Sequence, residues 1–296
     1  MKDQARKTTI GIEVEFNGID RLTAIKAVEK AVNGTRVING DGTIYDCHIT
    51  QDAQGRKWTV MRDGSIAGPD YQKCELVTPV LTYEEDIATF QEVIRELRHA
   101  GAKAHTSCGI HIHIGKDGHT PATLRNLVNL FSQRIDLVYK ALDVLPSRQV
   151  EWCKRFEGDF VKKLNANKPK TMQAFEDAWY GAYPDGPRSR HYHKSRYHAL
   201  NLHSLFNSSH HTIEMRLFNS TLHAGKIKAY IVLALAMNQQ ALDCKSISPR
   251  PVYSDNNKFA MRTWMNRMGL IGEEFKNVRD HLLANLDGCA AWRFGA

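Results

Sequence analysis

Residues 9–16 read TIGIEVEF, and apolar and polar side chains alternate strictly along this stretch. A period of two predicts a β-strand, with Ile12 and Val14 on one face and Glu13 and Glu15 on the other. Three further stretches repeat this design, at residues 75–78 (ELVT), 108–115 (CGIHIHIG) and 211–218 (HTIEMRLF). Strands with one apolar and one polar face predict an antiparallel or mixed sheet that has its core on one side only.

Apolar residues recur at helical spacing between these strands. The patterns predict helices over residues 20–33, 83–100, 121–145 and 225–243, and further strands over residues 43–49, 57–62 and 197–205. Strands and helices are interspersed without regular βαβ alternation, which favours the α+β class with helices covering one face of the sheet. Residues 147–195 are less regular, and the basic, aromatic stretch 180–195 predicts a loop that could act as a lid.

The composition limits the class of protein. Of the 296 residues, 42% are hydrophobic and 24% are charged, which excludes a disordered or collagen-like chain. No window approaches the ~18 consecutive apolar residues of a membrane span, and the first residues lack the apolar region of a signal peptide. The six cysteines form no CxxC pair, so we expect reduced thiols rather than a zinc ribbon. We therefore expect a cytoplasmic protein with no membrane partner.

The polar faces of the four strands carry residue types that bind metal ions. These are Glu13 and Glu15, then Glu75, then His111 and His113, and finally Glu214 with Arg216. A period of two places the members of each pair on the same side of the sheet, roughly 7 Å apart. One strand with alternating glutamates is usually only a solvated face, so it is the conjunction of four such strands that favours a site.

Carboxylates gathered on one face need a counter-charge, because like charges held together shift one another's pKa. Divalent cations supply it, and a set made mostly of carboxylates suits Mg²⁺ or Mn²⁺ better than structural zinc. Magnesium held by carboxylates usually recruits phosphate oxygens as further ligands, so we expect a nucleotide. Arg216 would bind a phosphate or stabilise a phosphoryl group during its transfer.

Four motifs together resemble a known family. They are GIEVEF (11–16), the segment 63–79 that ends in ELVTP, GIHIHIG (109–115) and TIEMRLFNST (212–221). In this order they resemble the carboxylate–amine ligases with a glutamine synthetase-like catalytic fold, most closely the amidoligases and more distantly glutamate–cysteine ligase. The resemblance spans residues 9–240 and implies a mainly antiparallel, curved sheet with an open catalytic face. It also implies that ATP phosphorylates a carboxylate and that an amine then attacks the acyl phosphate.

The resemblance implies a role for the residues on the polar faces. Glu13, His111 and Glu214 resemble the ligands of the ion that bridges the transferred phosphoryl group. Glu15 and Glu75 resemble the ligands of a second ion. The motifs therefore imply at least two divalent cations on one sheet face.

Three more roles follow from the same motifs. Asp63 is a further candidate ligand of the second ion. Arg216 resembles the arginine that stabilises the phosphoryl group, so that Arg216, Glu214 and Glu13 form the expected catalytic set. His113 is either a ligand of a third ion or a residue that faces the substrate.

Four residues in or near the basic loop are candidates for contacts with ATP or a substrate: Arg188, Arg190, Arg196 and Asn201. The loop could cover ATP or hold an anionic acceptor, and a solvated basic loop would have the same composition. Asn201 could equally make a structural hydrogen bond.

The expected organisation is a ligase domain over residues 1–245 and a helical extension over residues 246–296 packed on the same domain. Residues 147–195 would form an insertion or lid within the ligase domain. The expected substrates are a small-molecule or peptide carboxylate and an amine, and the acceptor could also be a nucleotide or a protein. The oligomeric state stays open.

Two other functions fit parts of the sequence. The His-x-His pair could bind zinc and activate water for hydrolysis together with a later histidine, namely His198, His203, His210 or His211. That alternative leaves the paired glutamates and Arg216 without a role. The formal charge of +8 is compatible with a basic nucleic-acid-binding protein, although no zinc-finger, RNP or helix-turn-helix signature is present.

Overall fold

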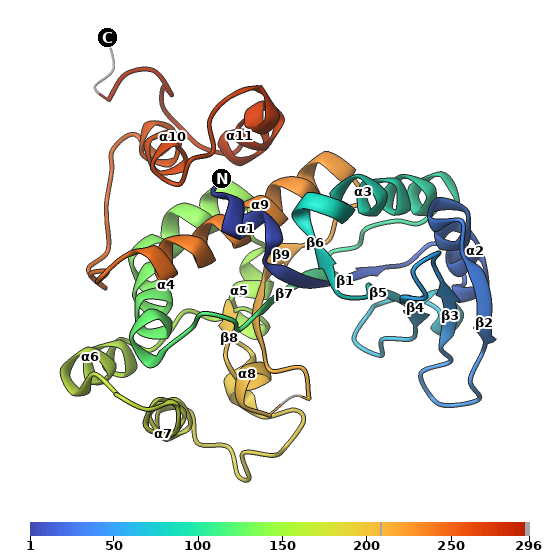
Figure 1. Cartoon of the computed structure of the whole chain (residues 1–296), viewed down its shortest axis with the longest axis horizontal. Coiled ribbons are helices and arrows are strands. Elements are labelled where there is room, and N and C mark those ends of the chain that lie inside the picture. The colour runs from blue at the N-terminus through green and yellow to red at the C-terminus, as the bar shows by residue number, and fades with distance from the viewer. Residues whose placement is uncertain (208, 294–296) are drawn as a thin grey trace. The chain divides into compact units, whose positions relative to one another are not determined.

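The computed structural model describes residues 1–207 and 209–293 (Figure 1). The chain forms two compact units. Unit 1 comprises Met1–Thr8, Ile114–Leu217 and Val232–Ala296, and unit 2 comprises Thr9–His113 and Phe218–Ile231. In the described ranges, no helix is both long enough and apolar enough to cross a bilayer.

Unit 2 is built on an antiparallel sheet around β1 (Thr9–Phe16). On one side of β1 the strand order continues with β5 (Cys74–Val77), β4 (Lys57–Met61), β3 (His48–Gln51) and β2 (Thr35–Asn39). On its other side lies β7 (Gly109–Gly115), and the short β6 (Leu81–Thr82) also pairs with β1. The pairs from β2 through to β1 are all antiparallel. The predicted α+β class with a mainly antiparallel sheet is confirmed.

The register of β1 against β5 separates the core from the polar face. Val14 lies opposite Leu76, and Glu15 lies opposite Glu75. Both apolar side chains are fully buried, as is Val60 opposite Leu76 on β4. Since alternate residues point to opposite faces, the two glutamates lie on the face that the core does not use.

Two helices supply the core of unit 2. They are α2 (Arg21–Val32) and α3 (Tyr83–His99), which pack on each other, and α2 also packs on β3 and β4. Each begins at a side-chain cap: Asp20 accepts a hydrogen bond from Thr23 N at 2.8 Å, and Thr82 accepts one from Glu85 N at 3.3 Å. The 3₁₀ turn η1 (Asp70–Gln72) lies between β4 and β5 in the sequence.

Unit 1 is mainly helical. Its helices are α1 (Asp3–Lys7), α4 (Pro121–Leu142), α5 (Pro146–Glu151), α6 (Gly158–Asn167), α7 (Met172–Ala182), α8 (His203–Asn207), α10 (Asn257–Arg267) and α11 (Lys276–Leu283). It also contains the 3₁₀ turns η2 (Lys194–Arg196) and η3 (Glu273–Phe275) and the strand β8 (Leu200–Asn201). The unit boundaries fall inside β7, β9 (Thr212–Asn219) and α9 (Ala224–Asp243).

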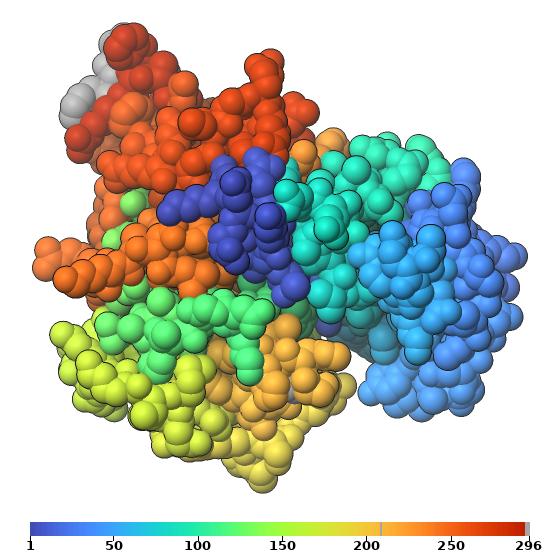
Figure 2. Space-filling view, viewed as in Figure 1, coloured from blue at the N-terminus to red at the C-terminus, as the bar shows by residue number. Residues whose placement is uncertain are grey.

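Helix α4 organises the core of unit 1. It begins as the sequence predicts, with Thr120 as a capping residue and Pro121 in the first turn. Two buried asparagines on α4 bind the segment that follows α9, because Asn126 Nδ2 donates to Cys244 O at 2.6 Å and Asn129 Nδ2 donates to Ile247 O at 2.8 Å. Helices α10 and α11 pack on each other, and Figure 2 shows their side chains in orange and red.

Several elements differ from the sequence patterns. The stretch 146–182 contains α5, α6 and α7, which the patterns did not predict. The strand predicted over 197–205 is only the two residues of β8, because Asn201 Oδ1 accepts a hydrogen bond from His203 N at 2.8 Å and the chain turns into α8. The strand predicted over 43–49 begins at residue 48, since the Asp41 side chain holds a loop by accepting from Thr43 N and Cys47 N.

The predicted division of the chain at residue 245 stays a prediction. Residues 246–296 were expected to form a helical extension, and their described part contains α10 and α11 within unit 1. The expected likeness to the glutamine synthetase catalytic fold also stays a prediction.

Candidate metal centre

Neighbouring strands bring Glu13 of β1 and two histidines of β7 together in unit 2. Glu13 Oε2 lies 2.8 Å from His111 Nδ1, and Glu13 Oε1 lies 3.3 Å from His113 Nε2. Burial disfavours the ionised form of Glu13, but the attraction of His113 and the hydrogen bonds with both histidines outweigh it. They hold the pKa of Glu13 well below its usual range, so this carboxylate is ionised at neutral pH.

Two groups of possible metal ligands lie on this face of unit 2. One contains Glu13, Glu75 and His111, and the other contains Glu15, Asp63 and Glu75. In each group the ligand atoms all lie within 4.8 Å of one another. Glu75 belongs to both groups, so its carboxylate lies where it could serve two ions.

The donor chemistry of these groups fits a hard divalent cation. Four of the five residues are carboxylates and the fifth is an imidazole, which is a set suited to Mg²⁺ or Mn²⁺. Glu15 is almost fully buried, and one of its oxygens accepts a hydrogen bond from Gly109 N at 2.6 Å. A buried carboxylate beside two others would be stabilised by a cation, because like charges raise one another's free energy.

Asp63 reaches this centre from a loop rather than from a strand. The loop follows β4, and Asp63 Oδ1 accepts a hydrogen bond from Ser65 N at 2.7 Å. Further along, Ala67 N donates to Ser107 Oγ at 2.9 Å and Ala67 O accepts from Asn17 Nδ2 at 3.3 Å. The loop is therefore fastened to two distant parts of unit 2.

In unit 1, Glu214 and Arg216 lie two residues apart on β9, and both are buried. Arg216 Nη1 donates to Glu214 Oε1, and Asn201 Nδ2 donates to Glu214 Oε2 at 2.6 Å. Arg148 Nη2 also donates to the backbone oxygen of Arg216 at 3.0 Å. Asn201 therefore makes structural hydrogen bonds. That Glu214 shares an ion with residues of unit 2 stays a prediction.

The arginines of the basic loop contact acidic and aromatic side chains of unit 1. Arg188 donates to Asp177 Oδ1 at 2.7 Å and lies over the ring of Tyr180. Arg190 lies 3.6 Å from an oxygen of Asp185. Arg196, the third predicted contact, donates to His191 O at 3.1 Å and lies near the rings of Tyr192 and Tyr197. Their role in binding a nucleotide stays a prediction.

Two of the later histidines, His198 and His203, serve as core residues of unit 1, whereas His210 and His211 are exposed. His198 lies among the rings of Phe156, Trp179 and Tyr183, and the hydroxyl of Tyr180 lies 2.7 Å from His203 Nδ1. Burial is the main cause that lowers the pKa of each histidine to about 4. Across the described part of the chain, no group of three ligand residues contains His198, His203, His210 or His211. The zinc-hydrolase alternative therefore gains no support from the geometry.

Unit 1 also contains a pocket of about 180 Å³. It is lined by Phe131, Ser132, Ile135, Asp136, Lys154, Arg155, Phe156, Ala199 and Pro251. The sequence patterns marked none of these as site residues, because they come from segments that lie far apart in the sequence.

Comparison with known proteins assigns the family. A family model described as "Putative amidoligase enzyme" matches residues 6–238. Among solved structures, the chain resembles the crystal structure of a bifunctional glutathione synthetase from Pasteurella multocida, with 12% sequence identity and a TM-score of 0.39. The likeness covers 94% of this chain and 47% of that chain, so this chain spans about half the length of that structure. No curated protein matches the chain. Because the family model covers more than half of the 296 residues, the chain belongs to this amidoligase family.

Proposed function

We propose that this protein is an ATP- and Mg²⁺-dependent ligase that joins a carboxylate to an amine through an acyl phosphate. The observation that supports it best is the pair of ligand groups in unit 2 that share Glu75. Membership of the amidoligases supplies the class of reaction, and the acidic donor set supplies the reason for a divalent cation.

The proposed reaction has two steps. First, an oxygen of the substrate carboxylate attacks the γ-phosphorus of ATP, which forms the acyl phosphate and releases ADP. Next, the amine attacks the acyl carbon, phosphate leaves, and the nitrogen loses a proton to complete the amide. The substrates we propose are a small-molecule or peptide carboxylate and an amine.

The residues of unit 2 would hold the nucleotide phosphates through cations. Bound divalent cations would neutralise the phosphate oxygens and stabilise charge during phosphoryl transfer. Glu13 is suited to this role because its low pKa keeps it ionised, and Glu15 is held by Gly109 N. These two side chains are thus oriented by protein contacts before any cation arrives.

Arg216 is the residue we propose for direct stabilisation of the phosphoryl group. A guanidinium presents several N–H donors in one plane and matches phosphate oxygens well. The side chain is buried and its Nη1 already donates to Glu214, so its orientation is set by the fold of unit 1.

The test is release of ADP and phosphate in the presence of Mg²⁺, over pooled carboxylates and pooled amines, with mass spectrometry to find the amide. Glu75→Gln removes the ligand common to both groups and should reduce turnover by about 100-fold or more. The matched control is Glu29→Gln, which removes a carboxylate of unit 2 that pairs with Arg36 instead.

The proposal predicts ADP release that depends on both substrates, on Mg²⁺ and on Glu75. Full turnover by Glu75→Gln would contradict it. Amide cleavage by the purified protein without ATP would instead favour a hydrolase.

A further inference from the structure

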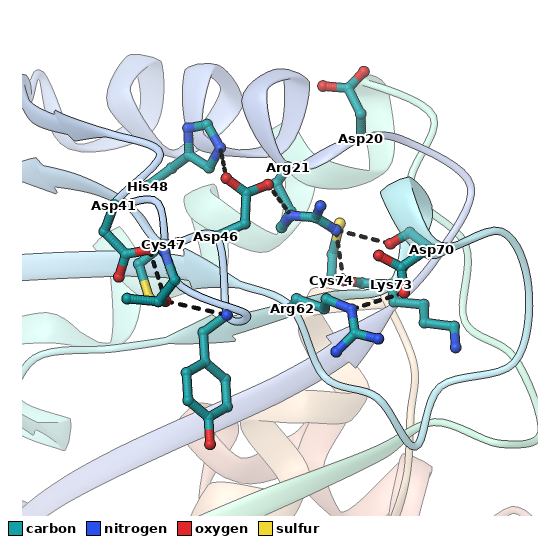
Figure 3. A network of polar contacts seen from close by, with 12 residues as sticks. Asp20, Arg21, Asp41, Asp46, Cys47, His48, Arg62, Asp70, Lys73 and Cys74 are labelled. Carbon is teal, nitrogen blue, oxygen red and sulfur yellow. Dashed lines mark hydrogen bonds and ion pairs between the residues drawn. The ribbon is translucent and has the colours of Figure 1, made fainter.

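A buried arginine, Arg21, connects two separate segments of unit 2 (Figure 3). It stands in the first turn of α2, and its Nε donates to Asp46 Oδ2 at 2.7 Å. Its Nη1 donates to the backbone oxygens of Asp70 at 2.9 Å and Lys73 at 3.3 Å. One guanidinium therefore fastens both the loop before β3 and the segment that leads into β5.

A second arginine closes the loop that carries Asp63. Arg62 Nε donates to Asp70 Oδ1 at 2.7 Å, and its backbone N donates to Tyr45 O at 2.7 Å. Arg62 directly precedes Asp63, and Asp70 lies just beyond the loop, so this ion pair joins the two ends of the loop. Figure 3 shows Asp70 in contact with both arginines.

These contacts act on two of the ligand residues through the chain. Asp63 follows Arg62 by one residue, and Glu75 follows Lys73 by two. Neither carboxylate is on the helix that carries Arg21. Arg21 limits instead the positions that the backbone of residues 62–75 can take.

We propose that Arg21 is a positioning residue for the Glu15–Asp63–Glu75 group, which it holds in a geometry ready for a cation. The inference rests on the proposed function, because it assumes that this group binds a divalent cation. An arginine suits the task since its rigid fork reaches three acceptors in two segments, whereas the ammonium of lysine is a single point of charge.

The effect of Arg21 should be selective between the two ligand groups. Glu13 and His111 lie on β1 and β7, and their contact at 2.8 Å needs none of the segments that Arg21 holds. The group with Asp63 depends on the loop, so loss of Arg21 should weaken that group more.

The test measures Mn²⁺ binding to the full chain in the absence of nucleotide. The EPR signal of free Mn²⁺ reports how much of the ion stays unbound. The variants are Arg21→Gln, Arg21→Lys and Arg62→Gln. The matched control is Arg36→Gln. It removes another arginine of unit 2, whose guanidinium donates to both carboxylate oxygens of Glu29 and to Asn39 Oδ1. Hydrogen exchange of the 62–75 peptide provides a second readout.

We expect wild type to bind Mn²⁺ at two classes of site. Arg21→Gln should weaken the class that contains Asp63 by about 10- to 100-fold, as loss of residues that orient ligands usually does. The other class shares Glu75 but does not use the loop of Asp63, so it should weaken less. Arg21→Lys should bind Mn²⁺ with an affinity between those of wild type and Arg21→Gln, and Arg36→Gln should match wild type. Hydrogen exchange of residues 62–75 should rise only in Arg21→Gln, Arg21→Lys and Arg62→Gln.

The outcomes separate this inference from the proposed function. If wild type binds no Mn²⁺, both the metal centre and the role of Arg21 are wrong. If wild type binds Mn²⁺ and the folded variants bind it equally at every site, only the role of Arg21 is wrong. Should Arg21→Gln fail to fold, Arg62→Gln decides, because that side chain is 30% exposed and its loss leaves the core intact.

Discussion

Glu15 and Glu75 lie directly opposite each other on the antiparallel strands β1 and β5, on the face of the sheet that the core does not use. Like charges placed opposite one another across a sheet destabilise it. Both residues belong to the group that also contains Asp63. We therefore expect the pairing to cost stability when no cation is bound, so that a bound cation would stabilise the sheet of unit 2.

Addition of Mg²⁺ should raise the thermal stability of the protein. A cation that binds only the folded state at 100 times its Kd stabilises that state by about 2.7 kcal/mol. Melting curves followed by circular dichroism, in EDTA and in Mg²⁺, measure the effect. Glu75→Gln should melt at or above wild type in EDTA, because it removes one of the paired charges, and should gain little from Mg²⁺. An equal gain in both proteins would contradict the assignment.

Arg216→Lys should lose activity while it retains the fold. The ammonium keeps the positive charge but cannot donate from two nitrogens in one plane. We expect ADP release to fall by about 100- to 1,000-fold, as when an electrostatic donor to a transition state is lost. Arg6→Lys, which changes a paired arginine of unit 1 in the same way, is the control and should keep wild-type rates. Normal turnover in Arg216→Lys would remove this residue from the mechanism.

Asn201→Asp should destabilise unit 1 at neutral pH. The change replaces the N–H that donates to Glu214 Oε2 at 2.6 Å with a second carboxylate oxygen. Loss of this buried hydrogen bond costs about 1 to 3 kcal/mol, and repulsion adds to it. Urea unfolding at pH 7 and pH 5 checks both parts, because protonation of one carboxyl should restore some stability at the lower pH. Equal stability of variant and wild type at pH 7 would show that the contact contributes nothing.

Unit 1 should lose stability as the pH falls from about 6.5 towards 4. Burial lowers the pKa of both His198 and His203 to about 4, below the ordinary histidine value of about 6.5. The unfolded chain therefore binds more protons in this range, and stability is fully present only above it. Each pKa unit corresponds to about 1.4 kcal/mol, so the slope is measurable by urea unfolding.

His198→Phe provides the check on that slope. The imidazole stacks on Phe156 with ring centroids 5.8 Å apart, so a phenyl ring fits the same aromatic cluster. The variant should show a shallower loss of stability between pH 6.5 and 4 than wild type. An unchanged slope would mean that this histidine does not titrate on unfolding as expected.

The sequence predicts the polar face of the sheet well, because its signal is local. The alternation in residues 9–16 and 109–115 places Glu13 and His111 on matching faces, and adjacent strands then bring them to 2.8 Å. Asp63 is different, since its place depends on two hydrogen bonds of Ala67, which donates to Ser107 and accepts from Asn17, 40 and 50 residues away from it in the sequence. Arg21 and Asp70 carry no periodic signal either, so the pattern could not mark them.

Two errors in the fold have equally specific causes. Residues 197–205 alternate as a strand would, but the side chain of Asn201 bonds to His203 N and begins a helix. The strand β2 is only partly buried, with Val37 44% exposed, so it shows no clear apolar face in the sequence. The side chain of Asn201 thus overrides the alternation at residues 197–205, and the weak contrast in burial leaves β2 without a pattern that predicts a strand.

Glu75 is common to both ligand groups of unit 2. Whichever position fills first draws on a carboxylate that the other also needs, so occupancy of the two positions is linked rather than independent. The dependence of turnover on free magnesium should then depart from a simple hyperbola.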